Sequence, residues 1–398
     1  MVGRPLTFEP FKLEQYFARW EFTAPYLLCS SDLEALSLRE LLALADEETS
    51  RLWQDLRLGY TETLGHPRLR REIAGLYEGV RPEDVLVFSG AQEPIFVAMS
   101  VLLGRGDHAI VVTPTYQSLY SIPRGTGADV TLVALDPERG WALDLDHLAR
   151  AVTPRTRVIA LNVPNSPTGT LVDRATFAAL AALARERGIV LFCDEVYRWL
   201  EYDEADRLPA GVETSEHGLS LGVMSKAFGL AGLRIGWIAT RDADLLRRLA
   251  EFKHYTTICN SGPSEILALM ALRARGPLLA RARAIIQDNL GRLDRFFAEW
   301  KGALEWTRPR AGTIGFPRFV DGASTEDLGR ELVEKRGVLI LPGSVFDWSA
   351  AYFRIGLGRK NMPEALGRFE EFLSARPPSG RAAASLPRGR SSWPESEN

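Results

Sequence analysis

The fold is decided by residues 157–194, RVIALNVPNSPTGTLVDRATFAALAALARERGIVLFCD, in which two apolar runs flank one helical pattern. RVIALNV (157–163) and GIVLFCD (188–194) are short and rich in β-branched residues, as buried strands are. Between them, RATFAALAALARERG has apolar residues at i, i+3 and i+4 spacing and closes at Gly188, a typical helix C-cap. This order predicts two parallel strands joined by a crossover helix.

Further strand-like runs, several separated by helical patterns, extend this unit in both directions. They are DVLVF (84–88), AIVVT (109–113), VTLVAL (130–135) and LRIGWIAT (233–240). Alternation of this kind over residues 60–250 predicts an α/β fold with a large, doubly wound, mainly parallel sheet. Ligands of such sheets bind beyond the carboxyl ends of the strands.

The pattern changes after residue 260, where a long helical stretch is interrupted at Gly276-Pro277. A helical pattern then covers 324–336, and short strand-like pieces lie near 312–319, 337–341 and 352–357. These features predict a second, smaller α+β domain joined to the first by the long helix.

The chain is therefore expected to have four parts. Residues 46–275 would form the large domain and residues 276–374 the small domain, which residues 1–45 would complete. Residues 375–398 are rich in Pro, Gly, Ser, Arg and Ala without periodicity, so we expect a disordered tail.

The composition argues against several classes of protein. The 398 residues include 48 Lys+Arg and 51 Asp+Glu, which gives a net charge of −3. This balance lacks the excess of basic residues that proteins binding nucleic acid or an anionic membrane carry. No signal-peptide core or membrane-length apolar run is present, so we expect a cytoplasmic protein. The three cysteines lack CxxC spacing and the five histidines are scattered, so neither a disulfide framework nor a metal site is expected.

One lysine stands apart from the others. Only six of the 48 cationic residues are lysines, and Lys226 lies in VMSKAFGLAGLRIGW (223–237), an apolar, glycine-rich stretch without acidic residues. An apolar pocket lowers the pKa of an amine and makes it able to form a Schiff base. Arg234 offers a planar fork for phosphate or carboxylate. A surface lysine and a salt-bridged arginine are the ordinary alternatives.

Three other segments carry polar groups at the ends of predicted strands. PNSPTG (164–169) is a polar turn bracketed by prolines, and SGAQEPI (89–95) leads into a helix whose first N–H groups favour phosphate. In CDEVYRWL (193–200), Asp194 ends a buried strand, where its carboxylate needs a cationic partner such as a protonated heterocycle nitrogen. Ordinary turns and helix caps are the alternatives for all three.

In this order and at these intervals, the four segments resemble the class I/II aminotransferases, which are fold type I pyridoxal-phosphate enzymes. The resemblance covers roughly residues 25–373. Its most specific part is SK(x7)RxG, formed by Ser225, Lys226, Arg234 and Gly236 and preceded by PTG and DEVY. It implies pyridoxal 5'-phosphate as cofactor and transfer of the amino group of an L-amino acid to a 2-oxo acid.

The resemblance also implies three catalytic roles. Lys226 would hold the cofactor as a Schiff base and then act as general base and acid. Asp194 would pair with the pyridinium nitrogen, and Tyr197 would hydrogen-bond the phenolic oxygen of the ring. The remaining cofactor contacts would come from Gly90, Ala91, Gln92, Tyr116, Arg234 and either Asn165 or Ser166.

Two implied residues concern the substrate and a partner subunit. Arg354, in YFRIGLGR, would bind the α-carboxylate of the substrate bidentately. Tyr60 would reach the phosphate of the partner subunit's cofactor, which implies a homodimer with shared active sites. An exposed strand arginine is the alternative for Arg354.

The sequence departs from the family pattern at two positions. Ser166 occupies the place of the asparagine that usually precedes the proline of PTG, and the asparagine stands one residue earlier, at Asn165. Val223 occupies the place of a phosphate-binding Ser or Thr, so that contact is absent or comes from elsewhere.

The opening segment, residues 11–46, differs from that of general amino-acid aminotransferases and resembles a specialised-metabolism branch related to capreomycidine synthase. That likeness implies an alternative reaction, β-elimination or replacement by a cyclase or lyase acting on a hydroxylated, arginine-derived amino acid. Glu14, Glu21 and Asp32 would suit a cationic side chain, or are solvated helix charges. A non-catalytic regulator on this fold is disfavoured, because Lys226 is present and no winged-helix-length extension precedes residue 45.

Overall fold

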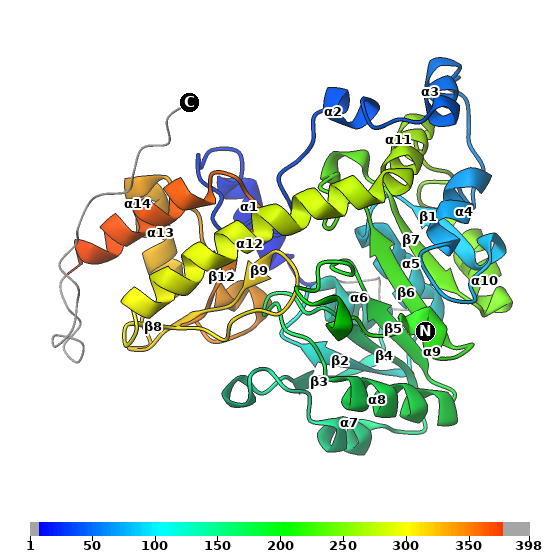
Figure 1. Ribbon diagram of the computed structural model, residues 1–398. Coiled ribbons are helices and arrows are strands. Elements are labelled where there is room, and N and C mark those ends of the chain that lie inside the picture. Colours follow the sequence, from blue (N-terminus) through cyan, green and yellow to red (C-terminus); the bar gives the residue numbers. More distant parts are fainter. Residues whose placement is uncertain (1–7, 377–398) are drawn as a thin grey trace.

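The computed structural model describes residues 8–376 and has a large unit and a small unit (Figure 1). The long helix α12 (Arg275–Glu299) runs from the large sheet to the group of helices and short strands around α13 and α14 (Figure 1). The tail predicted over 375–398 lies, from residue 377 on, outside the described residues.

The large unit is built on a seven-stranded sheet with the order β1-β7-β6-β5-β4-β2-β3. Strand β7 runs antiparallel to its neighbours β1 and β6, and the other neighbouring pairs are parallel. This sheet confirms the predicted α/β fold. The strands are β1 Val85–Phe88, β2 His108–Thr113, β3 Asp129–Ala134, β4 Thr156–Asn162, β5 Val190–Asp194, β6 Gly218–Val223 and β7 Gly236–Thr240.

Both faces of the sheet are buried, as a doubly wound sheet requires. Along β4, Val158 and Ala160 join one hydrophobic cluster, whereas Ile159 and Leu161 join another. The clusters therefore lie on opposite faces, because successive side chains of a strand point in opposite directions.

The helices of this unit are α2 Leu38–Leu42, α3 Glu47–Gln54, α4 Pro67–Ala74, α5 Gln92–Leu102, α6 Ser118–Thr126, α7 Leu145–Ala151, α8 Arg174–Glu186, α9 Gly211–Thr214, α10 Ala243–Lys253 and α11 Gly262–Arg273.

The structure differs from the sequence prediction at three points. Strand β6 has the sequence GLSLGV, and it was not among the predicted runs because it holds one β-branched residue. Strand β7 begins at Gly236 rather than 233, because Arg234 has a left-handed backbone with a φ of 51°. The long helix breaks at Ala274, and Pro277 sits in the first turn of α12, where a missing N–H is tolerated.

The small unit has its own hydrophobic cluster, which includes Phe296, Phe353 and Phe369. The N-terminal segment pairs with it, since Tyr26 bridges Val338 and the Gly356 N–H donates to the Leu28 carbonyl at 2.6 Å. We propose on these contacts that residues 46–275 and 276–374 are the two main parts of the fold and that the described N-terminal residues up to 45 complete the small part, although α2 within them packs against α11 of the large unit. The elements are α1 Lys12–Trp20, β8 Leu304–Glu305, β9 Ile314–Gly315, β10 Arg318–Phe319, α13 Thr325–Arg336, β11 Leu341–Pro342, β12 Phe353–Gly356 and α14 Met362–Ser374.

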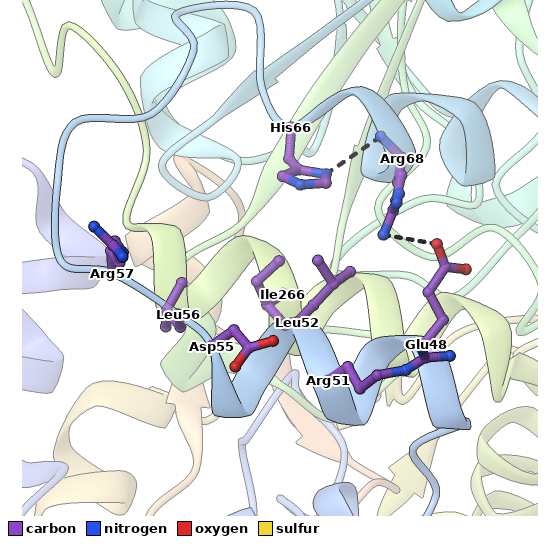
Figure 2. Close-up of a pocket in the computed structure, with 9 residues that line it drawn as sticks. All are labelled: Glu48, Arg51, Leu52, Asp55, Leu56, Arg57, His66, Arg68 and Ile266. Carbon is purple, nitrogen blue, oxygen red and sulfur yellow. Dashed lines mark hydrogen bonds and ion pairs between the residues drawn. The ribbon is translucent and has the colours of Figure 1, made fainter.

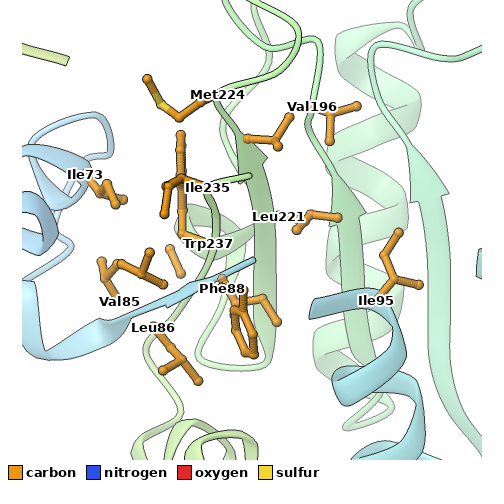
Figure 3. Packing of buried hydrophobic residues seen from close by; sticks show 14 of the residues in the cluster. Ile73, Val85, Leu86, Phe88, Ile95, Val196, Leu221, Met224, Ile235 and Trp237 are labelled. Atoms are coloured by element: carbon orange, nitrogen blue, oxygen red, sulfur yellow. The ribbon is translucent and has the colours of Figure 1, made fainter. Parts of the chain in front are cut away.

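Trp237 of β7 is the largest fully buried side chain of the core, and it lies among Ile235, Leu221 and Phe88 (Figure 3). Its indole N–H donates to the Tyr77 hydroxyl at 2.8 Å. The indole occupies the space above Gly222 of β6, where any Cβ would overlap it.

No helix within residues 8–376 has both the length and the apolar character needed to cross a bilayer.

Gly222→Ala is therefore expected to destabilise the fold by about 1–3 kcal/mol, because the added methyl forces Trp237 out of place. Gly291→Ala is the matched control, since Gly291 lies inside α12 with no atom near its missing Cβ, and alanine favours a helix there. Thermal unfolding of both variants checks this. A Gly222→Ala midpoint at or above that of Gly291→Ala would contradict the packing argument.

Candidate active site

Two neighbouring strands end in polar side chains at the same edge of the sheet. Asn162 ends β4 and Asp194 ends β5, and the two residues are paired in the strand register. The loop after β6 brings Ser225 and Lys226 to the same place. The side chains surround a cavity of about 360 Å³, within the size range of small-molecule sites.

The cavity has walls from both units. The sheet unit contributes Ala91, Gln92, Ile95, Tyr116, Asn162, Ser166, Asp194, Val196, Tyr197, Ser225, Lys226, Ala231 and Arg234. The N-terminal segment and the small unit contribute Leu13, Glu14, Phe17, Glu21, Ser30, Ser31, Asp32 and Arg354. Most of the residues predicted as site residues thus lie on one cavity.

Lys226 projects into the cavity from the loop after β6. Its Nζ donates to Ser31 Oγ at 2.8 Å and lies 5.7 Å from the centre of the Tyr197 ring. The Tyr197 hydroxyl donates to the Ser31 carbonyl at 3.3 Å. Ser31, which was not predicted, therefore holds both the amine and the phenol in place.

Asp194 is 3% exposed, and its carboxylate has no cation within hydrogen-bond distance in residues 8–376. Burial raises the pKa of Asp194 to about 7, although the Val196 N–H, the Lys226 cation and the Asn162 amide oppose that rise. A cation beside the carboxylate would favour its charged form. Asp194 is therefore a buried acceptor suited to a protonated ring nitrogen.

The turn after β1 and the loop after β6 meet at one end of the cavity. Gly90 has a φ of 76°, and a Cβ there would overlap the Arg234 guanidinium, so only glycine allows this approach. Ala91 precedes α5, whose first N–H groups and dipole favour an anion. Ser225 lines the cavity, whereas Val223 is buried inside β6 and cannot reach it.

Tyr116 lies on the cavity wall near α1. Its hydroxyl donates to Glu14 Oε1 at 3.0 Å, and its ring centre is 5.1 Å from that of Phe11. Burial and the Glu14 carboxylate raise the pKa of Tyr116 well above its usual range, so the phenol keeps its proton. These contacts hold the aromatic ring in one orientation.

Arg354 projects from β12 and is 3% exposed. Its Nε donates to the Cys29 carbonyl at 3.0 Å, and its buried Nη2 has no hydrogen-bond partner among residues 8–376. A buried, unpaired guanidinium nitrogen is costly. Arg354 can therefore bind, through its free Nη2, an anionic group that enters the cavity.

Asn165 and Ser166 lie in different places. Asn165 is buried in the PTG turn, where its amide donates to the Pro114 carbonyl and its oxygen accepts from Thr168. Ser166 lines the cavity, and its N–H donates to Asn162 Oδ1 at 2.5 Å. Asn162 was not predicted, although it carries the signal that identified Asp194, a polar residue at the end of a buried strand.

Tyr60 lies away from this cavity and is 94% exposed. The chain that carries it borders a second hollow of about 700 Å³, between α3 and the start of α4 (Figure 2). There Arg68 forms an ion pair with Glu48, and the His66 ring accepts the Arg68 N–H (Figure 2). None of the predicted site residues lines this hollow.

The residues of the 360 Å³ cavity fit pyridoxal 5'-phosphate. They include a primary amine at Lys226, a buried acid at Asp194 and, at one end, Ala91 before the first N–H groups of α5 beside Arg234, whose guanidinium approaches Gly90 where no Cβ can be placed. The unpaired Nη2 of Arg354 adds a place for the carboxylate of an amino acid.

Comparisons with known proteins agree with this chemistry. The chain is 31% identical to capreomycidine synthase from Streptomyces vinaceus over 364 residues, which cover 91% of this chain and 93% of that protein. A pyridoxal-phosphate-dependent aminotransferase from Streptococcus suis superposes with a TM-score of 0.87 at 31% identity, covering 92% of this chain and 98% of that one. The pyridoxal-phosphate-dependent cyclase OrfR superposes with a TM-score of 0.84 at 28% identity, covering 94% and 99%. The pattern of aminotransferase class I and II matches residues 26–369, and the chain belongs to that pyridoxal-phosphate-dependent family.

Proposed function

We propose that this enzyme transfers the amino group of an L-amino acid to a 2-oxo acid. One observation carries the proposal: Lys226, the buried Asp194 and the unpaired Nη2 of Arg354 share one cavity. An amino acid bound there has its carboxylate on the arginine and its amine near the lysine. That is the arrangement amino transfer requires.

When bound, pyridoxal 5'-phosphate supplies a ring that withdraws electrons from the α-carbon of the substrate. Lys226 Nζ anchors the cofactor and afterwards takes and returns the proton at the α-carbon. Asp194 keeps a proton on the ring nitrogen, and the buried site makes that charge pair stronger than it would be in water. Tyr197 and either Ser166 or Asn162, which line the same cavity, would hydrogen-bond the phenolic oxygen.

The other residues orient the cofactor and the substrate. Tyr116, held by Glu14 and Phe11, stacks on the ring face. Ala91, Gln92, Ser225 and Arg234 bind the phosphate, and Ser225 supplies the hydroxyl that Val223 cannot. Arg354 binds the α-carboxylate with two parallel N–H donors.

The alternative is elimination or cyclisation of a hydroxylated, arginine-derived amino acid on the same cofactor. Its support is the N-terminal wall of the cavity, together with the likeness to a capreomycidine synthase and a cyclase. Mass spectrometry of products from a panel of amino acids separates the two reactions. Transamination gives more than one equivalent of the donor's 2-oxo acid per active site only when an acceptor is present, whereas elimination or cyclisation turns over repeatedly without one and releases water or ammonia.

Lys226→Ala is expected to lower turnover by about 10²–10⁴-fold, because it removes the proton-transferring amine. Borohydride reduction followed by peptide mass spectrometry should find the cofactor mass on the Lys226 peptide of the wild type and on no peptide of the variant. Lys301→Ala, an exposed lysine, is the control and should retain the adduct. A reducible adduct that persists in Lys226→Ala would show that the cofactor does not form its Schiff base with Lys226.

Arg354→Lys is expected to raise the KM for the amino acid about tenfold or more, because an ammonium cannot reproduce a two-point fork. The absorbance of bound cofactor should stay at the wild-type level, since Arg354 binds the substrate. Arg330→Lys alters an exposed ion pair with Asp327 and should leave the KM unchanged. An equal KM in both variants would show that another cation takes the carboxylate.

We propose that two copies of the chain form a dimer through the surface around Tyr60. Exposed large apolar side chains gather there, with Leu58 at 87% exposure and Tyr255 at 90%. Their two segments are joined, since Thr61 Oγ1 donates to the Asn260 carbonyl at 2.9 Å. Such a patch is expected to be covered by another surface.

A mixed dimer tests whether Tyr60 acts across the interface. Tyr60→Ala should weaken cofactor binding about tenfold or more, because a hydrogen bond to a charged phosphate is lost. Co-expression of Tyr60→Ala with Lys226→Ala should restore sites that combine Lys226 of one chain with Tyr60 of the other. If the mixed dimer is no more active than Tyr60→Ala alone, the tyrosine acts within its own subunit.

A further inference from the structure

The wall of the active-site cavity opposite the sheet is acidic. It is formed by α1 and the segment that follows, and it brings Glu14, Glu21 and Asp32 to the same cavity as Lys226 and Arg354. The wall is fixed in place, because Tyr16 donates its hydroxyl to the Ile340 carbonyl at 3.0 Å and Lys12 forms an ion pair with Asp347. The carboxylates are therefore held at the site by the fold.

The three carboxylates differ in their partners. Asp32 accepts from Arg359 Nη2 with both oxygens, at 3.0 and 2.9 Å, and Glu14 accepts the Tyr116 hydroxyl. The carboxylate of Glu21 has no hydrogen-bond or ion-pair partner among residues 8–376. One carboxylate of the wall is thus left for an incoming group.

The charge environment of Glu21 is unbalanced. Burial, Asp32 and Glu14 raise the pKa of Glu21, while Arg359 and Arg354 lower it only in part. Arg359 is already bound to Asp32, and Arg354 lies in the same cavity with an unpaired buried Nη2. A cationic group beside Glu21 would relieve the repulsion between the carboxylates.

An amino acid bound for the proposed reaction connects these features. Its α-carboxylate binds Arg354, and its α-amine faces Lys226. The unpaired, buried Nη2 of Arg354 is an observation, independent of the carboxylates, that points to a ligand in this cavity. The side chain then extends toward whatever surface closes the rest of the cavity. That surface includes the carboxylates of the N-terminal segment.

We infer that the substrate is an amino acid whose side chain ends in a cation, and that Glu21 is the residue that selects it. This rests on the proposed function, because Arg354 and Lys226 set the direction of the substrate. Glu21 accepts charge-assisted hydrogen bonds from the terminal cation, which are stronger than bonds to a neutral group of the same shape. Glu14 and Asp32 add to the field without losing their present partners.

Arginine and citrulline are matched probes, since a guanidinium and a urea have the same shape and differ in charge. With the cofactor-loaded wild-type enzyme, kcat/KM for arginine should exceed that for citrulline about tenfold or more. Glu21→Gln should reduce this ratio about tenfold. Glu47→Gln, which changes an exposed carboxylate on α3, should leave the ratio at the wild-type value.

A binding measurement separates recognition from turnover. 5-Guanidinopentanoate is arginine without its α-amino group, so it can occupy Arg354 and Glu21 but cannot react. Calorimetry should show that it binds the wild type about tenfold or more tightly than 5-ureidopentanoate does, and that Glu21→Gln removes the difference.

The outcomes distinguish this inference from the function on which it rests. Equal kcat/KM for arginine and citrulline, or a ratio that falls equally in Glu21→Gln and Glu47→Gln, overturns the inference and leaves amino transfer standing. If no amino acid of either kind reacts and borohydride traps no adduct on Lys226, the proposed function fails and the inference fails with it.

Discussion

The buried carboxylate of Asp194 is the constraint on which the rest of the site depends. It lies at the end of β5, 3% exposed, and burial holds its pKa near 7. A cation beside this acid would favour its charged form, and the strand register places Asn162 next to it, where the Asn162 amide donates to the Asp194 main-chain carbonyl at 2.8 Å. The loop after β6 then brings the Lys226 amine to the same sheet edge, so the buried acid and the amine line one cavity.

The second half of the site comes from chain that is distant in sequence. Ser31 binds Lys226 Nζ through its hydroxyl and Tyr197 through its carbonyl, and Cys29 accepts from Arg354. These three contacts tie the N-terminal segment to cavity-lining side chains of both units. The sheet unit therefore forms one part of the cavity wall, and residues between Leu13 and Asp32 form another.

Sequence patterns predicted the parts of this structure that local rules determine. The crossover unit over 157–194 follows from hydrophobic periodicity, and the position of Asp194 at the sheet edge follows from a polar residue at a strand end. Lys226 was identified by its apolar, glycine-rich surroundings, and it lines the same cavity. Strand β6 was missed because its glycines lower β-propensity, yet Gly222 is required there by the Trp237 indole. Local patterns could not identify Ser31, because its partners are 166 and 195 residues away.

Which of Asn165 and Ser166 lines the cavity also depends on contacts that sequence spacing does not reveal. An asparagine in a polar turn can face the ligand or hydrogen-bond its own backbone, and sequence spacing alone does not separate these uses. In the fold, Asn165 satisfies Pro114 and Thr168 inside the turn, which leaves the cavity wall to Ser166 and Asn162. A function that a family assigns to one asparagine can thus be carried by a different polar residue, because the position of the side chain at the strand end determines which one reaches the ligand.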